Sequence, residues 1–182
     1  MLYDWRLLGR EKIFSRGFID IYRDKYSKKE GEDGSYFYVM DLPDWINIVA
    51  VTKDKRVLLI KQYRFGTRSF HIEIPGGAID KTDKDPLASA RRELLEETGY
   101  SGGKWTRIGQ VEPNPAIQSN RCFTYLADGV EFTQEPSFDD NEDIETIPAG
   151  MEEAYRMVET GEISHSLVVC ALMYAQKYLL NR

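Results

Sequence analysis

Within the first quarter of the chain, apolar and polar residues alternate in places with the period of two that is typical of β-strands. The alternation is clearest over residues 19–26, and a second apolar run covers residues 35–40. Gly31 and Gly34 lie between these runs and indicate a turn. We therefore predict antiparallel strands within residues 11–41.

Further apolar runs predict the strands of a central sheet. They lie at residues 45–51, 56–60, 71–75, 104–111 and 121–127, and residues 62–65 directly follow the second of them. Two helices are predicted later in the chain, at residues 151–160 and 165–180, with Gly161 between them. Together with one earlier helix, this order predicts an α/β protein with a mixed sheet and helices on both of its faces.

The earlier helix is predicted between Pro86 and Thr98. Asp85 is a favourable N-cap residue, and proline is favourable at the first helical position. Gly99 can adopt the left-handed conformation that commonly ends a helix. The bounds of this helix therefore follow from its own residues.

Three glutamates lie within about one and a half turns of this helix. Glu93 and Glu97 share a face, and Glu96 adjoins it, within reach of Arg92. Two carboxylates about 6 Å apart repel each other by roughly 3 kcal/mol at an effective dielectric constant of 20. A solvated face could relax this repulsion by spreading the side chains. A hard cation such as Mg²⁺ or Mn²⁺ would reverse it, and both interpretations stay open on the helix alone.

The residues before the helix favour the metal site. Gly76 and Gly77 allow the backbone to approach a ligand closely, and the carbonyl of Ala78 is the best backbone candidate for a metal ligand. Glu73 precedes Pro75 and is expected to point toward the same loop.

Composition narrows the class of protein. The chain has 182 residues, of which 42% are apolar, so we expect one folded domain with a sizeable core. The net charge of −6 argues against a nucleic-acid surface. No apolar run approaches a membrane span and no signal peptide opens the sequence, so we expect a cytoplasmic protein without membrane contact. Cys122 and Cys170 lie in apolar stretches and are expected to be buried, reduced thiols.

The segment from Gly77 to Tyr100 resembles the signature box of the Nudix hydrolases. In that box a Gly is followed by five residues, Glu, seven residues and Arg-Glu-apolar-x-Glu-Glu-x-Gly-apolar. The matching residues are Gly77, Arg92, Glu93, Leu94, Glu96, Glu97, Gly99 and Tyr100. One departure is that fourteen residues separate Gly77 from Arg92 where the family has thirteen, so Asp83 or Lys84 stands near the place of the isolated glutamate. The resemblance implies the Nudix fold, an α/β/α sandwich.

The resemblance also implies hydrolysis of a nucleoside diphosphate linked to another group, with Mg²⁺ or Mn²⁺ as cofactor. Carried onto this chain, it makes Glu93 and Glu97 the main metal ligands, with the carbonyl of Ala78. Glu96 would be a ligand or bind the metal through water, and Arg92 would orient the glutamates. Cations would neutralise the diphosphate and acidify the attacking water.

In relatives that cleave ADP-ribose and nucleotide sugars, a general base lies on an acidic loop downstream of the box. Here that loop covers residues 138–145, where Glu142 is the first candidate and Asp140 and Glu145 follow. A plain solvated acidic loop is the alternative.

The same resemblance suggests residues that bind the substrate. Arg64 would bind a phosphate through its planar fork, with a surface salt bridge as the alternative. Trp45 could stack on a base or pack in the core. Pro115 lies in the segment whose sequence differs between subgroups, and Glu73 is a further candidate.

We interpret residues 1–45 as a strand extension used for dimerisation, as in relatives, and residues 46–182 as the Nudix hydrolase domain. The predicted reaction is cleavage of nucleoside diphosphate sugars such as GDP-mannose or ADP-ribose by a homodimer. A dedicated ADP-ribose pyrophosphatase is the first alternative, and a non-catalytic nucleotide-binding module is an alternative from another class.

Overall fold

The computed structural model describes residues 3–138 and 143–179 of the chain. These residues form two compact units. The first unit combines residues 1–43 with residues 112–121, and the second combines residues 44–111 with residues 122–182.

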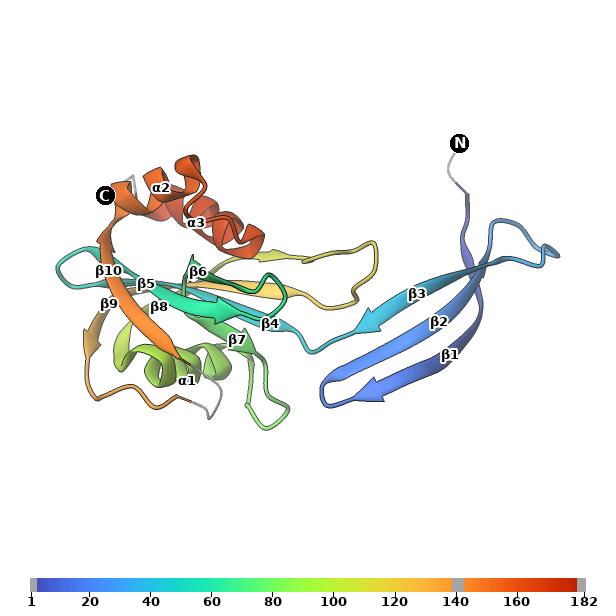
Figure 1. Ribbon diagram of the computed structural model, residues 1–182, viewed down its shortest axis with the longest axis horizontal. Coiled ribbons are helices and arrows are strands. Elements are labelled where there is room, and N and C mark those ends of the chain that lie inside the picture. Colours follow the sequence, from blue (N-terminus) through green and yellow to red (C-terminus); the bar gives the residue numbers. More distant parts are fainter. Residues whose placement is uncertain (1–2, 139–142, 180–182) are drawn as a thin grey trace. The chain divides into compact units, whose positions relative to one another are not determined.

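The first unit is a three-stranded antiparallel sheet. Its strands, in the order β1-β2-β3, are β1 (Arg6–Arg16), β2 (Ile19–Ser27) and β3 (Ser35–Asp41) (Figure 1). The 112–121 segment joins this unit through β3, because the Met40 N–H donates to the Ile117 carbonyl at 2.7 Å. The predicted N-terminal antiparallel strands are confirmed. The first strand begins earlier than expected, because its pairing with β2 extends through residues that have little alternation of their own.

The second unit contains the other strands and the three helices that the described residues form. Its strands are β4 (Trp45–Thr52), β5 (Arg56–Arg64), β6 (Ser69–Glu73), β7 (Gly76–Ala78), β8 (Tyr100–Val111), β9 (Cys122–Phe132) and β10 (Ile144–Gly150). Its helices are α1 (Pro86–Thr98), α2 (Met151–Thr160) and α3 (Ser166–Leu179). None of the helices in the described part of the chain is long and apolar enough to cross a membrane. Of the two cysteines, Cys122 is buried as expected, whereas Cys170 is only partly buried.

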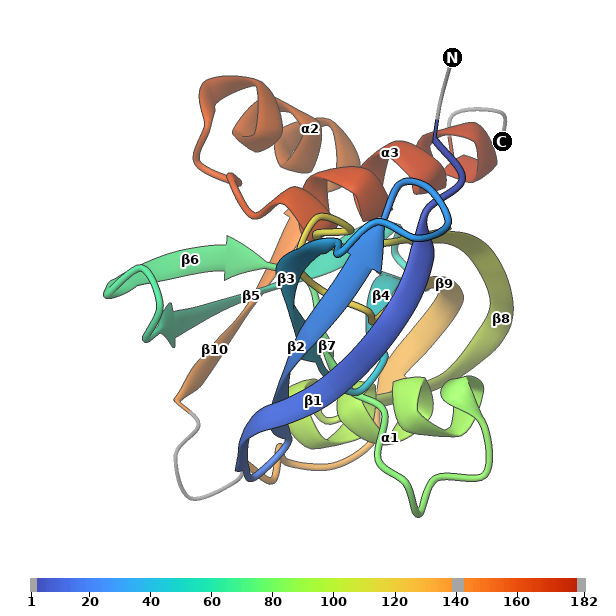
Figure 2. The same cartoon turned by 90° about the vertical axis from the view of Figure 1, so that its right-hand side faces the viewer.

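The sheet of the second unit has the strand order β10-β5-β4-β9-β8, with β6 paired to β5 and β7 paired to β4. The β4 and β9 strands run parallel, and the other pairs are antiparallel. The predicted mixed sheet is therefore confirmed. Figure 2 shows β5 and β6 as a hairpin that extends from this sheet.

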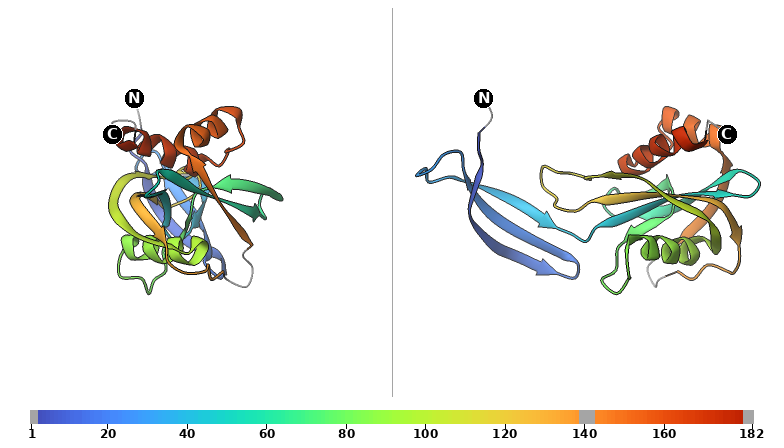
Figure 3. Two further views of the ribbon diagram at one scale, coloured as in Figure 1. Left: turned by 90° about the vertical axis from the view of Figure 1, so that its left-hand side faces the viewer. Right: turned by 180° about the vertical axis from the view of Figure 1, so that it is seen from behind.

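The two faces of the sheet carry separate cores. Along β4, Ile46 and Ile48 pack on the side of Leu94 of α1, whereas Val49 and Val51 pack on the side of α2 and α3. Successive residues of a strand point to opposite faces, so one apolar strand supplies both cores. Figure 3 shows α1 on one side of the sheet and α2 and α3 on the other. The α/β/α sandwich expected from the sequence is confirmed.

Two strands were not predicted. The three residues of β7 are too few for a periodic pattern, and β10 contains Pro148. The β10 strand forms because Ile144–Gly150 pairs along β5 in continuous antiparallel register. Both strands are therefore consequences of tertiary pairing.

Candidate active site

The box loop enters the sheet where β4 and β5 separate. These two strands pair only at Val51 and Val57, and further along β4 their place is taken by β7, in which Gly76 pairs with Asn47. Between these points the Ile48 N–H donates to the Pro75 carbonyl at 2.8 Å. The Gly76–Ala78 strand is thereby held between β4 and α1.

The two glycines are needed for these close approaches. A Cβ atom on Gly76 would collide with the backbone carbonyl of Ile46 and lie 2.9 Å from Asn47 Oδ1. A Cβ atom on Gly77 would lie 2.7 Å from the carboxyl carbon of Glu93. The strand therefore contacts a carboxylate of α1 with no room for a side chain between them.

Helix α1 begins and ends as its sequence predicts. Asp85 Oδ1 accepts the Ala88 N–H at 2.8 Å, and proline occupies the first turn. Gly99 has φ of 74°, and its N–H donates to the Leu95 carbonyl. These local signals set the bounds of the helix, and its docked face brings Glu93 and Glu97 against β7.

The three glutamates have different environments. Glu97 is almost fully buried, and its Oε2 accepts the Gly76 N–H at 3.0 Å. Arg92 Nη2 lies 3.0 Å from Glu93 Oε1, and Arg92 Nη1 donates to Glu96 Oε2 at 2.8 Å. Arg92 thus bridges two of the carboxylates, and the predicted contact with Glu96 is confirmed.

The structure assigns a contact to Asp83, which the sequence left undecided. Arg92 Nε and Nη2 donate to Asp83 Oδ2 at 3.3 and 3.0 Å. Hydrogen bonds from Arg92, and then from Ser89, lower the pKa of Asp83 below its ordinary value. Burial by itself lowers the pKa of Arg92, but Asp83 and Glu93 outweigh it, so the pKa of the guanidinium is raised. The loop is one residue longer than in the family, and Asp83 on it still provides an acidic partner for Arg92.

The oxygen atoms that these glutamates offer are the kind of ligand that a hard divalent cation prefers. Glu93 and Glu97 offer carboxylate oxygens beside the Gly76–Ala78 strand, and oxygen ligands are the ones that Mg²⁺ and Mn²⁺ prefer. Among the described residues, no three His, Cys, Asp or Glu side chains are close enough together to form a complete metal site by themselves. Further ligands would thus have to be backbone carbonyls, such as that of Ala78, or oxygens of substrate and water.

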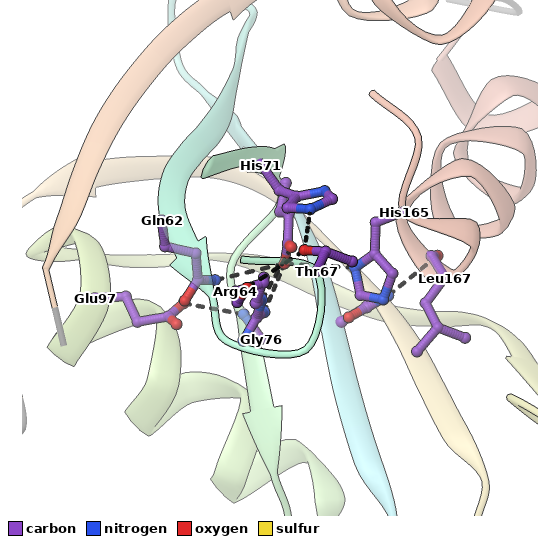
Figure 4. Close-up of polar contacts among 10 residues, drawn as sticks. Gln62, Arg64, Thr67, His71, Gly76, Glu97, His165 and Leu167 are labelled. Atoms are coloured by element: carbon purple, nitrogen blue, oxygen red, sulfur yellow. Dashed lines mark hydrogen bonds and ion pairs between the residues drawn. The ribbon is translucent and has the colours of Figure 1, made fainter. Parts of the chain in front are cut away.

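A second polar cluster lies on the β5–β6 hairpin (Figure 4). Glu73 is only 2% exposed, and Arg64 holds it by two hydrogen bonds, Nε to Oε1 at 2.9 Å and Nη2 to Oε2 at 2.6 Å. Gln62 Nε2 lies 3.5 Å from the same Oε2, and His165 Nδ1 lies 3.4 Å from it. Burial by itself raises the pKa of Glu73, but His165 and Arg64 outweigh it and lower the pKa to about 2. The carboxylate is therefore ionised at neutral pH.

The other predicted site residues lie elsewhere. Trp45 is half-buried at the start of β4, between Ala78 of β7 and Cys122 of β9. Pro115 belongs to the first unit, and Glu142 lies outside the described residues. The roles predicted for these three residues stay predictions.

Sequence reasoning did not find His165. It directly precedes α3 and reaches Glu73 through the folding of that helix onto the sheet. Gln62 carried a usable signal, because it stands two residues before Arg64 and so shares its face of β5.

Comparison with known proteins decides the family. The NUDIX domain description matches residues 43–166, which is more than half of the chain. The chain belongs to the NUDIX family. It is a Nudix hydrolase, and the signature box that matches the family is the segment that places the glutamates beside Gly77.

Relatives are similar along nearly their whole length. The chain is 28% identical to an ADP-ribose pyrophosphatase of Bacillus subtilis over 172 residues, covering 94% of this chain and 92% of that protein. It is 27% identical to a GDP-mannose pyrophosphatase of Escherichia coli K12 over 181 residues, covering 93% and 94%. A crystal structure of an ADP compounds hydrolase matches the fold with a TM-score of 0.82 at 19% identity, covering 100% of this chain and 97% of that one.

Proposed function

We propose that this Nudix hydrolase cleaves the diphosphate bond of nucleoside diphosphate sugars, with ADP-ribose and GDP-mannose as the leading substrates. The observation that carries the proposal is the pair of clusters in the second unit: carboxylates of α1 against Gly76 and Gly77, and a guanidinium on the adjoining hairpin. The similarity to an ADP-ribose pyrophosphatase and a GDP-mannose pyrophosphatase supports both substrates.

The carboxylates of Glu93 and Glu97 would hold Mg²⁺ or Mn²⁺, with the carbonyl of Ala78. A divalent cation held there would supply charge neutralisation of the diphosphate and acidification of water. Arg92 keeps Glu93 and Glu96 in place through the contacts described above. Because those contacts are charge-assisted, they stabilise the orientation of the glutamates before substrate binds.

Arg64 is the proposed phosphate-binding residue. Its side chain is 44% exposed although it holds the buried Glu73, so the guanidinium has a buried edge and a solvent-facing part. A fork of N–H donors suits a phosphate, whose oxygens it can bind in pairs. Glu142 remains the proposed general base, with Trp45 and Pro115 as proposed contacts to the base or sugar.

We also propose that residues 1–45 serve homodimer formation and that the protein acts in the cytoplasm. Support for the dimer comes from the first unit, where many large apolar side chains are exposed. They are Tyr3, Trp5, Leu7, Leu8, Ile13, Phe14, Phe18, Tyr36, Phe37 and Tyr38. Apolar surface of this extent is typical of a surface that binds another protein chain.

A substrate panel with Mg²⁺ tests the proposal. It contains ADP-ribose, GDP-mannose, UDP-glucose, diadenosine polyphosphates and nucleoside triphosphates. We expect nucleotide sugars to yield a nucleoside monophosphate and a sugar phosphate. If only triphosphates are cleaved, the proposed substrate class is wrong. Turnover of ADP-ribose alone would favour the dedicated ADP-ribose pyrophosphatase.

The metal ligands are tested by Glu93→Gln and Glu97→Gln. Each removes one charge with little change of volume, and we expect kcat to fall about a hundredfold or more, the range typical of lost electrostatic stabilisation. Mn²⁺ binding measured by electron paramagnetic resonance should weaken in parallel. Near-normal turnover at saturating Mg²⁺ would refute the ligand assignment.

A further inference from the structure

The hairpin formed by β5 and β6 has one polar face. In its register Ile60 pairs with Glu73, Gln62 with His71, and Arg64 with Ser69. Paired residues share a face, so the polar side chains of the hairpin lie together, as Figure 4 shows for Gln62, Arg64 and His71. Arg64 therefore stands among polar groups that can influence where its guanidinium points.

The binding of a phosphate by Arg64 would disturb Glu73. Arg64 donates two hydrogen bonds to this carboxylate, whose residue is only 2% exposed. A phosphate bound at the solvent-facing edge of the guanidinium competes for Arg64 Nη2, which also donates to Glu73 Oε2, so this oxygen loses part of its hydrogen bonding when Arg64 turns toward the phosphate. A buried carboxylate that loses a charged partner is strongly destabilised unless another donor replaces that partner.

His165 is placed to be the replacing donor. Its Nδ1 lies 3.4 Å from Glu73 Oε2, the same oxygen that accepts from Arg64 Nη2. This Nδ1 atom is buried and, within the described residues, makes no hydrogen bond of standard geometry. Shortening this distance by a few tenths of an ångström and aligning the N–H with Oε2 would give a hydrogen bond of usual geometry.

The position of His165 is fixed independently of Glu73. Its carbonyl accepts the N–H groups of Val168 and Val169, both at 3.0 Å, so it caps the start of α3. The first turn of α3 is also held to β4, because Asn47 Nδ2 donates to the Leu167 carbonyl at 3.1 Å. The imidazole is thus presented to Glu73 by a well-anchored helix start.

We propose that His165 is a positioning residue for substrate phosphate. It donates to Glu73 when Arg64 turns toward the phosphate, and thereby lowers the cost of that movement. The inference rests on the proposed function, in which Arg64 binds phosphate, and adds a residue from α3 to the site.

Two variants separate this role from the capping of α3. His165→Ser keeps a good helix cap but is too short to reach Glu73, whereas His165→Asn keeps a cap and carries an amide N–H near the place of Nδ1. We expect His165→Ser to raise the KM for ADP-ribose about 3- to 10-fold, equivalent to about 0.6–1.4 kcal/mol, with kcat changed less than about twofold. His165→Asn should restore KM to within about twofold of the wild type.

Calorimetric binding of ADP-ribose without divalent metal should give a raised Kd for His165→Ser and a Kd near that of the wild type for His165→Asn. Thermal unfolding should show that both variants are folded. Equal KM values for all three proteins would overturn the inference. So would equal increases in the two variants, or a fall in kcat alone. Failure of the wild type to cleave any nucleotide sugar would overturn the proposed function, and this inference with it, before any substitution is made.

Discussion

Alanine at the adjacent Gly76 and Gly77 should have different effects. Gly77→Ala should mainly lower kcat, whereas Gly76→Ala should mainly lower the free energy of unfolding. In Gly77→Ala the new methyl group would lie 2.7 Å from the carboxyl carbon and Oε1 of Glu93, whereas ordinary contacts begin near 3.4 Å. The carboxylate must therefore retreat by about 0.7 Å. Because it is the end of a flexible side chain, the cost in folding free energy should stay below about 1 kcal/mol.

In Gly76→Ala the obstacle is backbone. The methyl group would collide with the Ile46 carbonyl and approach Asn47 Cα to 3.2 Å. A strand in the middle of the sheet cannot retreat as a side chain can, so we expect a loss of about 1–3 kcal/mol in the free energy of unfolding.

For Gly77→Ala, the main effect should be on turnover and not on stability. A displacement approaching 1 Å in a catalytic group can reduce the rate about a hundredfold, so Gly77→Ala should lower kcat about 30- to 100-fold while the protein stays folded. The assays are urea unfolding followed by circular dichroism and turnover of ADP-ribose at saturating Mg²⁺. Gly150→Ala is the matched control, since its φ of −67° suits alanine and no atom lies within 4 Å of the new methyl group.

Wild-type kcat in Gly77→Ala would refute the reasoning, because it would mean that the position of the Glu93 carboxylate does not matter for turnover. Equal losses of stability in the two glycine variants would also contradict it, because the contrast between backbone and side-chain obstacles would then be absent.

Three further predictions concern single side chains. Asp83→Asn should lower kcat about tenfold by weakening its contacts with Arg92, whereas Lys84→Ala should leave kcat unchanged; equal kcat values would refute this assignment. The pKa of Glu73 is lowered to about 2, so its contribution to stability is present above the unfolded value near 4.5 and is lost as pH falls toward 2. Urea unfolding between pH 5 and 2.5 should therefore depend less on pH in Glu73→Gln, by at most about 3 kcal/mol; unchanged pH dependence would contradict this. Burial raises the pKa of Cys122 to about 12, so mass spectrometry should find it unmodified by iodoacetamide at pH 8 until urea unfolds the protein.

Several features of the protein were determined by the sequence itself. Helix α1 has the predicted bounds because Asp85, Pro86 and Gly99 act within one turn of its ends. The spacing of the glutamates places Glu93 and Glu97 on one face of the helix by helix geometry alone. The mixed sheet with helices on both faces followed from the order of the apolar segments. The bounds of the helix and the spacing of the glutamates depend on contacts that are close in sequence, which is why periodicity and motif reveal them.

The tertiary structure alone decided the surroundings of these features. Asp83 rather than Lys84 contacts Arg92, because the path of the loop before α1 determines which side chain arrives there. The contact of His165 with Glu73 requires both the register of the β5–β6 hairpin and the docking of α3. Such contacts join residues far apart in sequence, and their energy is gained only after the sheet and the helices have packed together.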